Sequence, residues 1–348
     1  MKKITCIIGT RPQLIKHSAL LNELEKSFTV TTTNTLQHYQ YELNELLSEE
    51  LFQKKQFLNI EMPQDLMPAE RLGKMIVEIN TIVNSDKPDC ILVYGDTDTT
   101  LAAALTGNKN TIKLVHIEAG ERSYNKNMPE EHNRVITDNL SEIHFCASQK
   151  AVENLKKENI TGHVFYTGDL MKDVFLNFAN ELTFPPAENY FFCTIHRNYN
   201  KNNPKKLKEL FTTLNALSKK IALPLHPATL KSLEFNGIEI TGYENIQVMP
   251  PLSYKQSISY QKFSDAVITD SGGIQKEAYW LKRPCITIRK ESEWTETLKG
   301  NWNQLVYDNL SDLNQMIKTI PDNKQYNEDL YGDGKAAVTI TSILSKLI

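Results

Sequence analysis

The feature that most constrains the fold of this chain is a regular alternation between short apolar runs and amphipathic stretches along its whole length. The apolar runs are four or five residues long, as expected for strands that are buried on both faces. The stretches between them place apolar residues at helical spacing. This alternation predicts an α/β fold in which parallel sheets are flanked by helices.

The expected elements follow from that pattern. We expect strands in the first half at Ile4–Ile8, Thr29–Thr33, Cys90–Tyr94, Lys113–Ile117, Ile143–Cys146 and His163–Tyr166, and in the second half at Phe191–Ile195, Ile221–Pro224, Ala266–Thr269 and Cys285–Arg289. We expect helices at Leu14–Leu24, Arg71–Ile82, Asp98–Leu105, Ala151–Glu158, Lys206–Leu217, Tyr254–Phe263 and Ile274–Leu281.

The length of 348 residues predicts two domains, because a single domain holds roughly 150 residues. We expect an N-terminal domain at 1–168, a second domain at 169–334 and a final helix at 335–348. Two α/β halves of this kind predict a ligand-binding cleft between them, at the carboxyl ends of the strands.

Composition excludes several classes of function. The formal net charge of -3 gives no support for nucleic-acid binding. The apolar run at the N-terminus is too short for a signal peptide and no segment approaches 18 apolar residues, so we expect a cytoplasmic protein without a membrane partner. The scattered cysteines form no CxxC pair, which predicts reduced core residues and no metal site: Cys6, Cys90, Cys146, Cys193 and Cys285.

The first strand-to-helix turn, Gly9 to Gln13, is a candidate anion site. Its sequence matches neither the dinucleotide-binding nor the P-loop pattern, so no NAD or other cofactor is expected. Such a turn presents backbone N–H groups, and Arg11 and Lys16 add positive charge, which suits a diphosphate. The alternative is an ordinary turn with a surface arginine.

Carboxylates stand at three further positions that converge on one sheet edge. Asp96 and Glu118 end two apolar runs, and Glu130 opens a helix. Each has a simpler explanation alone, such as a helix N-cap or a first-turn acid. Together, clustered carboxylates raise one another's pKa and supply both an acid and a base near neutral pH.

In the second half, His196 stands where a strand ends, and the segment Thr269 to Glu277 follows another strand. The small residues of Ser271–Gly273 allow close backbone approach before a helix begins, which favours a phosphate. Glu277, one turn into the helix, is a candidate acceptor for ribose hydroxyls. A tight structural turn is the alternative.

These residues give the chain a family resemblance. It resembles the non-hydrolysing UDP-N-acetylglucosamine 2-epimerases in six motifs, which occur in the same order and at similar spacing across nearly the whole chain: GTRPQLIK, YGDTDTT, HIEAGERS, MPEEHNR, TIHR and TDSGGIQKEA. The resemblance implies a GT-B-like architecture of two Rossmann-like domains, a C-terminal helix that returns to the first domain, a homodimer and a UDP-sugar substrate.

The resemblance also implies residue roles. The acids implicated in catalysis match Asp96, Glu118 and Glu130, with His196 beside the diphosphate. Substrate-binding positions match Arg11, Lys16, Ser271, Gly272, Gly273 and Glu277, and Arg122, Arg134 and Tyr254 are further candidates for binding. In similar enzymes UDP is eliminated to leave a 2-acetamidoglucal and is added back after protonation of the opposite face at C2.

The sequence departs from the commonest family pattern at a few positions. Gln13 replaces the usual Glu, Trp294 replaces an Arg, and the stretch around Tyr254 lacks the usual Gln and Phe. This combination resembles the branch that acts on UDP-2,3-diacetamido-2,3-dideoxyglucuronate. Losing an Arg at a planar recognition site changes binding chemistry.

Three other readings remain open at the level of sequence. A hydrolysing epimerase differs only in using water in the second step. A GT-B glycosyltransferase has no need for three acids, and a silent nucleotide-sugar-binding regulator has no need for an intact acid set. We expect the epimerase reaction, with precursors of surface polysaccharides as its products.

Overall fold

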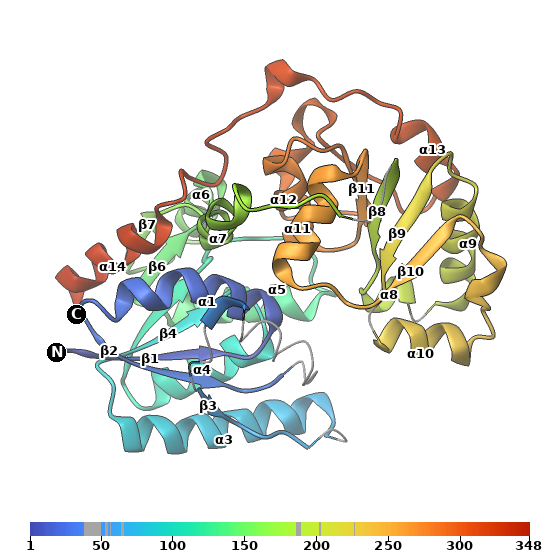
Figure 1. Cartoon of the computed structure of the whole chain (residues 1–348). Coiled ribbons are helices and arrows are strands. Elements are labelled where there is room, and N and C mark those ends of the chain that lie inside the picture. Colours follow the sequence, from blue (N-terminus) through green and yellow to red (C-terminus); the bar gives the residue numbers. More distant parts are fainter. Residues whose placement is uncertain are drawn as a thin grey trace. The chain divides into compact units, whose positions relative to one another are not determined.

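The computed structural model describes residues 1–37, 50–52, 55, 57–63, 66–185, 189–201, 203–225 and 227–348. The chain divides into two compact units, the first formed by Met1–Asn177 with Asp329–Ile348 and the second by Phe178–Glu328 (Figure 1). Each unit is built around one parallel sheet, so the predicted α/β class is confirmed.

The first unit contains a seven-stranded sheet in the order β3-β2-β1-β4-β5-β6-β7, and all neighbouring strands are parallel. The strands are β1 (Lys3–Ile8), β2 (Thr29–Asn34), β3 (Leu58–Asn59), β4 (Cys90–Tyr94), β5 (Lys113–Ile117), β6 (Ile143–Cys146) and β7 (His163–Tyr166). The helices are α1 (Arg11–Leu24), α3 (Pro68–Asp86), α4 (Asp98–Lys109), α5 (Pro129–Leu140), α6 (Gln149–Lys157), α7 (Leu170–Ala179) and α14 (Ala336–Leu347).

The central strands β1, β4, β5 and β6 are mostly apolar and buried because helices cover both faces of the sheet (Figure 1). In β1, Ile4 and Ile8 point into the core beneath α1 and α14, whereas Ile7 points into the core beneath α3 and α4. β4 alternates in the same way, with Leu92 on the first face and Val93 on the second.

The last helix completes the first unit. Ile340 and Leu344 of α14 are fully buried in the core that α1 also covers. Asp173 of α7 accepts hydrogen bonds from the backbone N–H groups of Ala336 and Ala337 at 3.1 and 2.8 Å, which satisfies the start of α14.

The unit boundaries differ from the domain boundaries expected from the sequence. The expected first domain ends at residue 168 and the expected second domain at 334, whereas the compact units change at 177/178 and 328/329. The reason is that α7 packs into the first unit through buried Leu170 and through the contact of Asp173 with α14. Strand periodicity alone carries no information on that packing.

The second unit contains a six-stranded parallel sheet in the order β10-β9-β8-β11-β12-β13. The strands are β8 (Tyr190–Thr194), β9 (Lys220–Pro224), β10 (Ile246–Met249), β11 (Ala266–Thr269), β12 (Cys285–Thr287) and β13 (Asn303–Leu305). The helices are α8 (Asn198–Lys201), α9 (Pro204–Asn215), α10 (Pro227–Phe235), α11 (Tyr254–Phe263), α12 (Gly272–Trp280) and α13 (Leu313–Met316), with 3-10 turns η1 (Ile240–Gly242), η2 (Thr295–Asn301), η3 (Leu310–Asp312) and η4 (Asn323–Gln325).

This sheet is also covered on both faces. Phe191 and Cys193 of β8 point toward the core that contains Leu210 and Phe211 of α9, whereas Phe192 points into the core next to Ala278 of α12. All five cysteines are free and buried in the two units, which agrees with the expected reduced core residues.

Several helices begin before the apolar spacing that predicts them. α1 begins at Arg11, three residues before the expected start, and α9 begins at Pro204, two residues before. Both have proline in the first two helical positions, where its missing N–H costs nothing. The polar first turns carry no apolar spacing, so periodicity misses them.

Candidate active site

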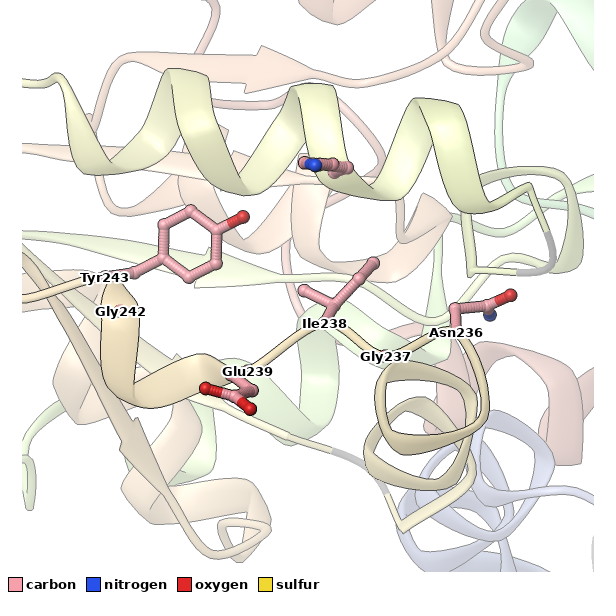
Figure 2. A pocket seen from close by; sticks show the side chains of 7 residues that line it. Asn236, Gly237, Ile238, Glu239, Gly242 and Tyr243 are labelled. Carbon is pink, nitrogen blue, oxygen red and sulfur yellow. The ribbon is translucent and has the colours of Figure 1, made fainter.

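A surface pocket of the second unit lies apart from every predicted site residue. It is lined by Lys208 of α9 and by Asn236, Gly237, Ile238, Glu239, Gly242 and Tyr243 (Figure 2). The segment 236–243 joins α10 to the start of β10, so it lies where strands begin, whereas ligands of parallel sheets bind where strands end. We assign it no function.

The carboxyl ends of β1, β4 and β5 lie side by side in the first unit. Cys6 pairs with Leu92, and Tyr94 pairs with Ile117. The turn after β1, the residue pair Gly95–Asp96 and Glu118 therefore leave the sheet at one edge. This register brings together the first anion-site candidate and two of the three predicted acids.

Gln13 joins two of these strand ends through its buried side-chain amide. Its Oε1 accepts from the N–H of Gly9 at 2.8 Å and of Thr10 at 3.2 Å. Its Nε2 donates to the carbonyl of Tyr94 at 2.7 Å and to the hydroxyl of Thr97 at 2.9 Å. A carboxylate has no proton to donate to a carbonyl. Gln13, which replaces the usual Glu of the family pattern, therefore makes a hydrogen bond to the end of β4 that an ionised Glu could not make.

Glu118 follows β5 in a left-handed backbone conformation, with φ of 64°. This region is unfavourable for a residue with a side chain, and such outliers gather at functional sites. Its carboxylate forms an ion pair with Lys16 of α1, whose side chain is 9% exposed. The structure thus brings together an acid and a cation that the sequence predicted separately.

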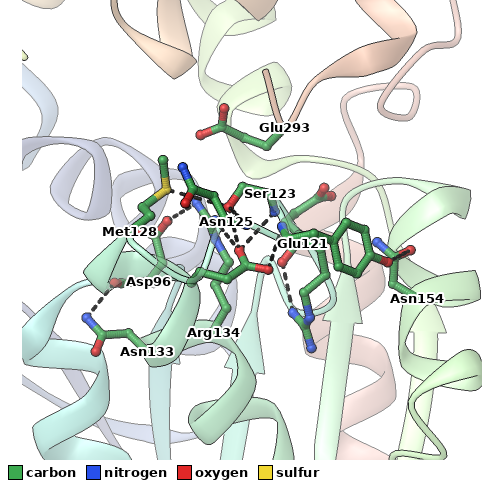
Figure 3. A network of polar contacts seen from close by, with 12 residues as sticks. Asp96, Glu121, Ser123, Asn125, Met128, Asn133, Arg134, Asn154 and Glu293 are labelled. Atoms are coloured by element: carbon green, nitrogen blue, oxygen red, sulfur yellow. Dashed lines mark hydrogen bonds and ion pairs between the residues drawn. The ribbon is translucent and has the colours of Figure 1, made fainter. Parts of the chain in front are cut away.

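Asp96 follows β4 and forms an ion pair with Arg134 of α5. The other terminal nitrogen of Arg134 lies 2.9 Å from Glu131, which also accepts from the backbone N–H groups of Ser123 and Tyr124 (Figure 3). Burial opposes ionisation of Glu131, but these donors stabilise the carboxylate and lower its pKa below the usual value.

Asn133 adds a second link between α5 and the end of β4. Its Nδ2 donates to the backbone carbonyl of Asp96 at 2.9 Å (Figure 3). Asp96 is therefore held through its side chain by Arg134 and through its backbone by Asn133, and its side chain remains 30% exposed. This combination of fixed position and partial exposure suits an acid that meets a substrate.

Arg122 has a different environment from the one expected for a substrate ligand. Its guanidinium side chain is fully buried, and it binds both carboxylate oxygens of Glu158 at 2.9 and 2.7 Å and one oxygen of Asp138 at 2.7 Å. The remaining terminal nitrogen donates to the carbonyl of Glu121. We therefore propose a structural role for Arg122 and leave it out of the proposed substrate set.

Asp138 also faces His116, and both side chains are fully buried. The Nδ1 of His116 lies 2.7 Å from Asp138, and its Nε2 lies 2.8 Å from the carbonyl of Gly95. Both ring nitrogens of His116 therefore lie within hydrogen-bond distance of oxygen atoms, which holds the ring between Asp138 and the end of β4. Burial alone would raise the pKa of Asp138, but His116 and Arg122 lower it.

Two more predicted residues occupy the first turns of helices in this unit. Arg11 is the first residue of α1, directly after the Gly9–Thr10 turn. Glu130 lies in the first turn of α5, next to Glu131, and is partly exposed. The helix dipole favours an anion near both positions.

In the second unit, His196 lies beyond the end of β8 and beside the end of β11. Its Nδ1 lies 2.8 Å from Asp270, which also accepts from the backbone N–H groups of His196 and Arg197 and from Asn200. Burial alone would raise the pKa of Asp270, yet these donors lower it to about 2. Asp270 therefore remains a carboxylate at neutral pH.

The Ser271–Gly273 turn opens helix α12, as the sequence predicted. A Cβ on Gly272 would lie 3.3 Å from the indole nitrogen of Trp294, so glycine allows that close approach. Trp294 is buried, and the ammonium of Lys276 lies 3.6 Å from the centre of its ring. The residue that replaces the usual Arg thus packs directly against the candidate phosphate turn.

Two predicted binding residues of this unit are more buried than expected. Glu277 is 4% exposed, and one of its oxygens accepts from Gln261 at 2.6 Å. Tyr254 is 2% exposed and packs edge-to-face against Phe178.

Among residues 1–37, 66–185 and the remaining described segments, no group of three His, Cys, Asp or Glu side chains is arranged to hold a metal ion. Over the same part of the chain, no helix has the length and apolar character needed to cross a membrane.

Comparison with known protein families identifies the family to which this chain belongs. The family model described as UDP-N-acetylglucosamine 2-epimerase matches residues 22–345. The chain belongs to the UDP-N-acetylglucosamine 2-epimerase family. It is therefore an enzyme of the isomerase class, and its two α/β units belong to the GT-B-like fold class.

Individual relatives cover the chain almost completely. A UDP-N-acetylglucosamine 2-epimerase of Methanococcus maripaludis is 37% identical, over 99% of this chain and 98% of the relative. A UDP-2,3-diacetamido-2,3-dideoxy-D-glucuronate 2-epimerase of Pseudomonas aeruginosa is 36% identical, over 99% and 100%. The crystal structure of the Methanocaldococcus jannaschii UDP-GlcNAc 2-epimerase in complex with UDP-GlcNAc and UDP is 33% identical, covers 99% of both chains and has a TM-score of 0.90.

Proposed function

We propose that this chain is a non-hydrolysing UDP-N-acetylglucosamine 2-epimerase that interconverts UDP-N-acetylglucosamine and its C2 epimer. Membership of the epimerase family carries the proposal. The geometry of the first sheet supports it, because Asp96 and Glu118 leave adjacent strands and each is paired with a cation. In this proposal, precursors of surface polysaccharides are the products.

The chemistry at C2 determines what the residues must do. The hydrogen on C2 is not adjacent to a carbonyl, so enolisation does not make it acidic. Removal of that proton as the C1–O bond breaks gives UDP and a 2-acetamidoglucal. Addition of a proton to the opposite face of C2 and re-formation of the C1–O bond with UDP then give the epimer.

We assign the proton transfers to the first unit. A carboxylate takes the C2 proton, a second acid delivers one to the opposite face, and Asp96, Glu118 and Glu130 are the candidates. Carboxylates also stabilise positive charge at C1, as they do in glycosidases. Lys16 and Arg134 hold Glu118 and Asp96 in place before the substrate arrives.

We assign the leaving nucleotide mainly to the second unit. The Ser271–Gly273 turn offers N–H groups at the start of α12, and His196 offers its second ring nitrogen. Arg11 contributes charge from the first unit. Donors that stabilise the departing diphosphate lower the barrier to C1–O cleavage. Glu277 is the candidate acceptor for the ribose.

A second candidate is UDP-2,3-diacetamido-2,3-dideoxyglucuronate 2-epimerase activity. The position of Trp294 against Gly272, and the similarity to the Pseudomonas aeruginosa enzyme of that name, favour it. Both candidates share the reaction at C2 and differ in the sugar. Turnover of the two UDP sugars, measured side by side, decides between them.

Deuterium incorporation tests the reaction itself. We expect the purified chain, incubated with UDP-N-acetylglucosamine in D2O without NAD, to place deuterium at C2 of the recovered nucleotide sugar, as read by NMR. Absence of exchange with both UDP sugars would refute the epimerase proposal. Release of free N-acetylmannosamine would select the hydrolysing reaction, and transfer to an acceptor without exchange would select a glycosyltransferase.

We also propose that the enzyme is a homodimer, as the family resemblance implies, and that it is cytoplasmic, as expected from its composition. Light scattering coupled to size-exclusion chromatography measures the first property, and cell fractionation measures the second. A mass equal to one chain would remove the dimer from the proposal without affecting the reaction.

A further inference from the structure

We infer that Asp270 is a positioning residue that fixes the ring orientation and the proton arrangement of His196, with Asn200 holding Asp270 in turn. The role in catalysis rests on the proposed function. The contacts between His196, Asp270 and Asn200 that support the inference all lie within the second unit.

The strand register places the two residues together. Thr194 at the end of β8 pairs with Thr269 at the end of β11, and their hydroxyls lie 2.6 Å apart. His196 and Asp270 leave the sheet just beyond these paired ends. Asp270 therefore contacts His196 from the neighbouring strand, and the pairing of β8 with β11 fixes the distance between the two residues.

Four donors hold the carboxylate. The backbone N–H of His196 lies 3.0 Å from one oxygen of Asp270, and that of Arg197 lies 3.0 Å from the other. Asn200 donates to Asp270 at 3.0 Å and also donates to the carbonyl of Ile288. Asp270 is fully buried. A buried carboxylate with these contacts has one orientation, because rotation would break several hydrogen bonds at once.

The fourth donor is the ring of His196. Its Nδ1 lies 2.8 Å from Asp270, and an ionised carboxylate accepts only, so the proton lies on Nδ1. The side chain of His196 is 44% exposed. In the neutral ring Nε2 is then an acceptor, and in the charged ring it is a donor whose positive charge Asp270 stabilises. Either state presents Nε2 in a fixed direction.

This arrangement has a specific use in the proposed reaction. When the C1–O bond breaks, negative charge grows on the diphosphate, and a ring held in one orientation by Asp270 offers a hydrogen-bond donor at Nε2 whenever that nitrogen carries a proton. When UDP attacks C1 again, the ring of His196 keeps the same position. Asp270 does not touch the substrate, and it acts only through His196.

Nitrogen NMR of the full chain tests the assignment directly. We expect the neutral ring of His196 to show the proton on Nδ1, whereas unconstrained histidines favour the proton on Nε2. Among the 8 histidines, the signal is assigned by its loss in His196→Gln. A wild-type spectrum with the proton on Nε2 overturns the inference without any variant at Asp270.

The variant Asp270→Asn adds a kinetic readout. We expect its His196 signal to move toward the Nε2-protonated form and its kcat for C2 exchange to fall about tenfold or more, with KM changing far less. Asn200→Ala is the matched control, because it keeps the carboxylate and removes a neighbouring donor, and we expect a smaller loss of kcat. Equal losses in both variants, or an unchanged tautomer in folded Asp270→Asn, contradict the inference.

The two proposals fail separately. If wild type exchanges no deuterium but His196 carries its proton on Nδ1, the reaction is wrong and the positioning stands. If exchange is present but the tautomer is the ordinary one, the reaction stands and Asp270 has no positioning role.

Discussion

The carboxyl edges of the two sheets differ in the kind of group that they expose. The first edge presents carboxylates, and each of Asp96 and Glu118 is held by a cation. The second edge presents backbone N–H groups and a histidine, and its carboxylate, Asp270, is fully buried. In the proposed function, the same α/β construction serves proton transfer in one unit and anion binding in the other. The comparison predicts that substitutions at the two edges damage different steps.

The largest expected effect is at Glu118. Replacing it with Gln removes the ionisable group and keeps the size of the side chain, so we expect C2 deuterium exchange to fall by at least about 100-fold. UDP affinity, measured by calorimetry, is expected to remain within about tenfold because we propose that the second unit makes most of the contacts with the nucleotide. A loss of UDP affinity as large as the loss of exchange would contradict the division of roles between the two sheet edges and would indicate a structural role for Glu118.

Arg122 tests whether a buried cation near the first edge has a structural role only. Replacing it with Met leaves buried Asp138 with fewer partners, and we expect the free energy of unfolding to fall by about 3 kcal/mol in urea titrations. The exposed Lys109→Met is the matched control and should change little. A large rise in KM of the folded Arg122→Met enzyme would return Arg122 to the substrate set.

Asp270 predicts an acid-dependent effect on stability. Its pKa is about 2 in the folded unit, below its ordinary value of 3.8. A depressed pKa stabilises the folded state above the unfolded value, and this contribution, about 2 kcal/mol, is lost as the pH falls from about 4 to 2. We therefore expect urea unfolding of Asp270→Asn to depend less on pH in that window than the wild type. An unchanged pH slope would mean that other groups dominate.

The smallest effect is expected at Gln13. In Gln13→Glu the donor to the carbonyl of Tyr94 is lost, but Thr100 still donates to that carbonyl at 2.6 Å, so we expect a loss of only about 1 kcal/mol. The ratio of kcat/KM for the two UDP sugars should stay constant. A change in that ratio would show that position 13 contributes to the choice of sugar, and would add substrate selection to the roles of the first sheet edge.

Much of this arrangement follows from local sequence. The apolar runs locate most strands, and the residues after them, such as Asp96, Glu118, His196 and Ser271, lie at the predicted sheet edges. Such predictions succeed because parallel strands end at one edge whatever the helices do.

Long-range contacts explain what the sequence does not reveal. The partners of Arg122 lie 16 and 36 residues away, and those of Asp270 lie about 70 residues away, so spacing alone cannot separate a buried ion pair from a substrate ligand. The strands β3, β10 and β13 were not predicted, because they lie at sheet edges, are partly exposed and form no continuous apolar run. Gln13 offered one signal, an amide where the family usually has an acid.

The return of α14 to the first unit has a consequence for synthesis on the ribosome. Residues 178–328 form the second unit from one continuous stretch, so its sheet and core are able to assemble as soon as that stretch emerges. The first unit lacks Ile340 and Leu344 of its core until translation reaches them. The unit that begins first is therefore completed last, and the apolar face that α14 covers stays exposed until the end of synthesis.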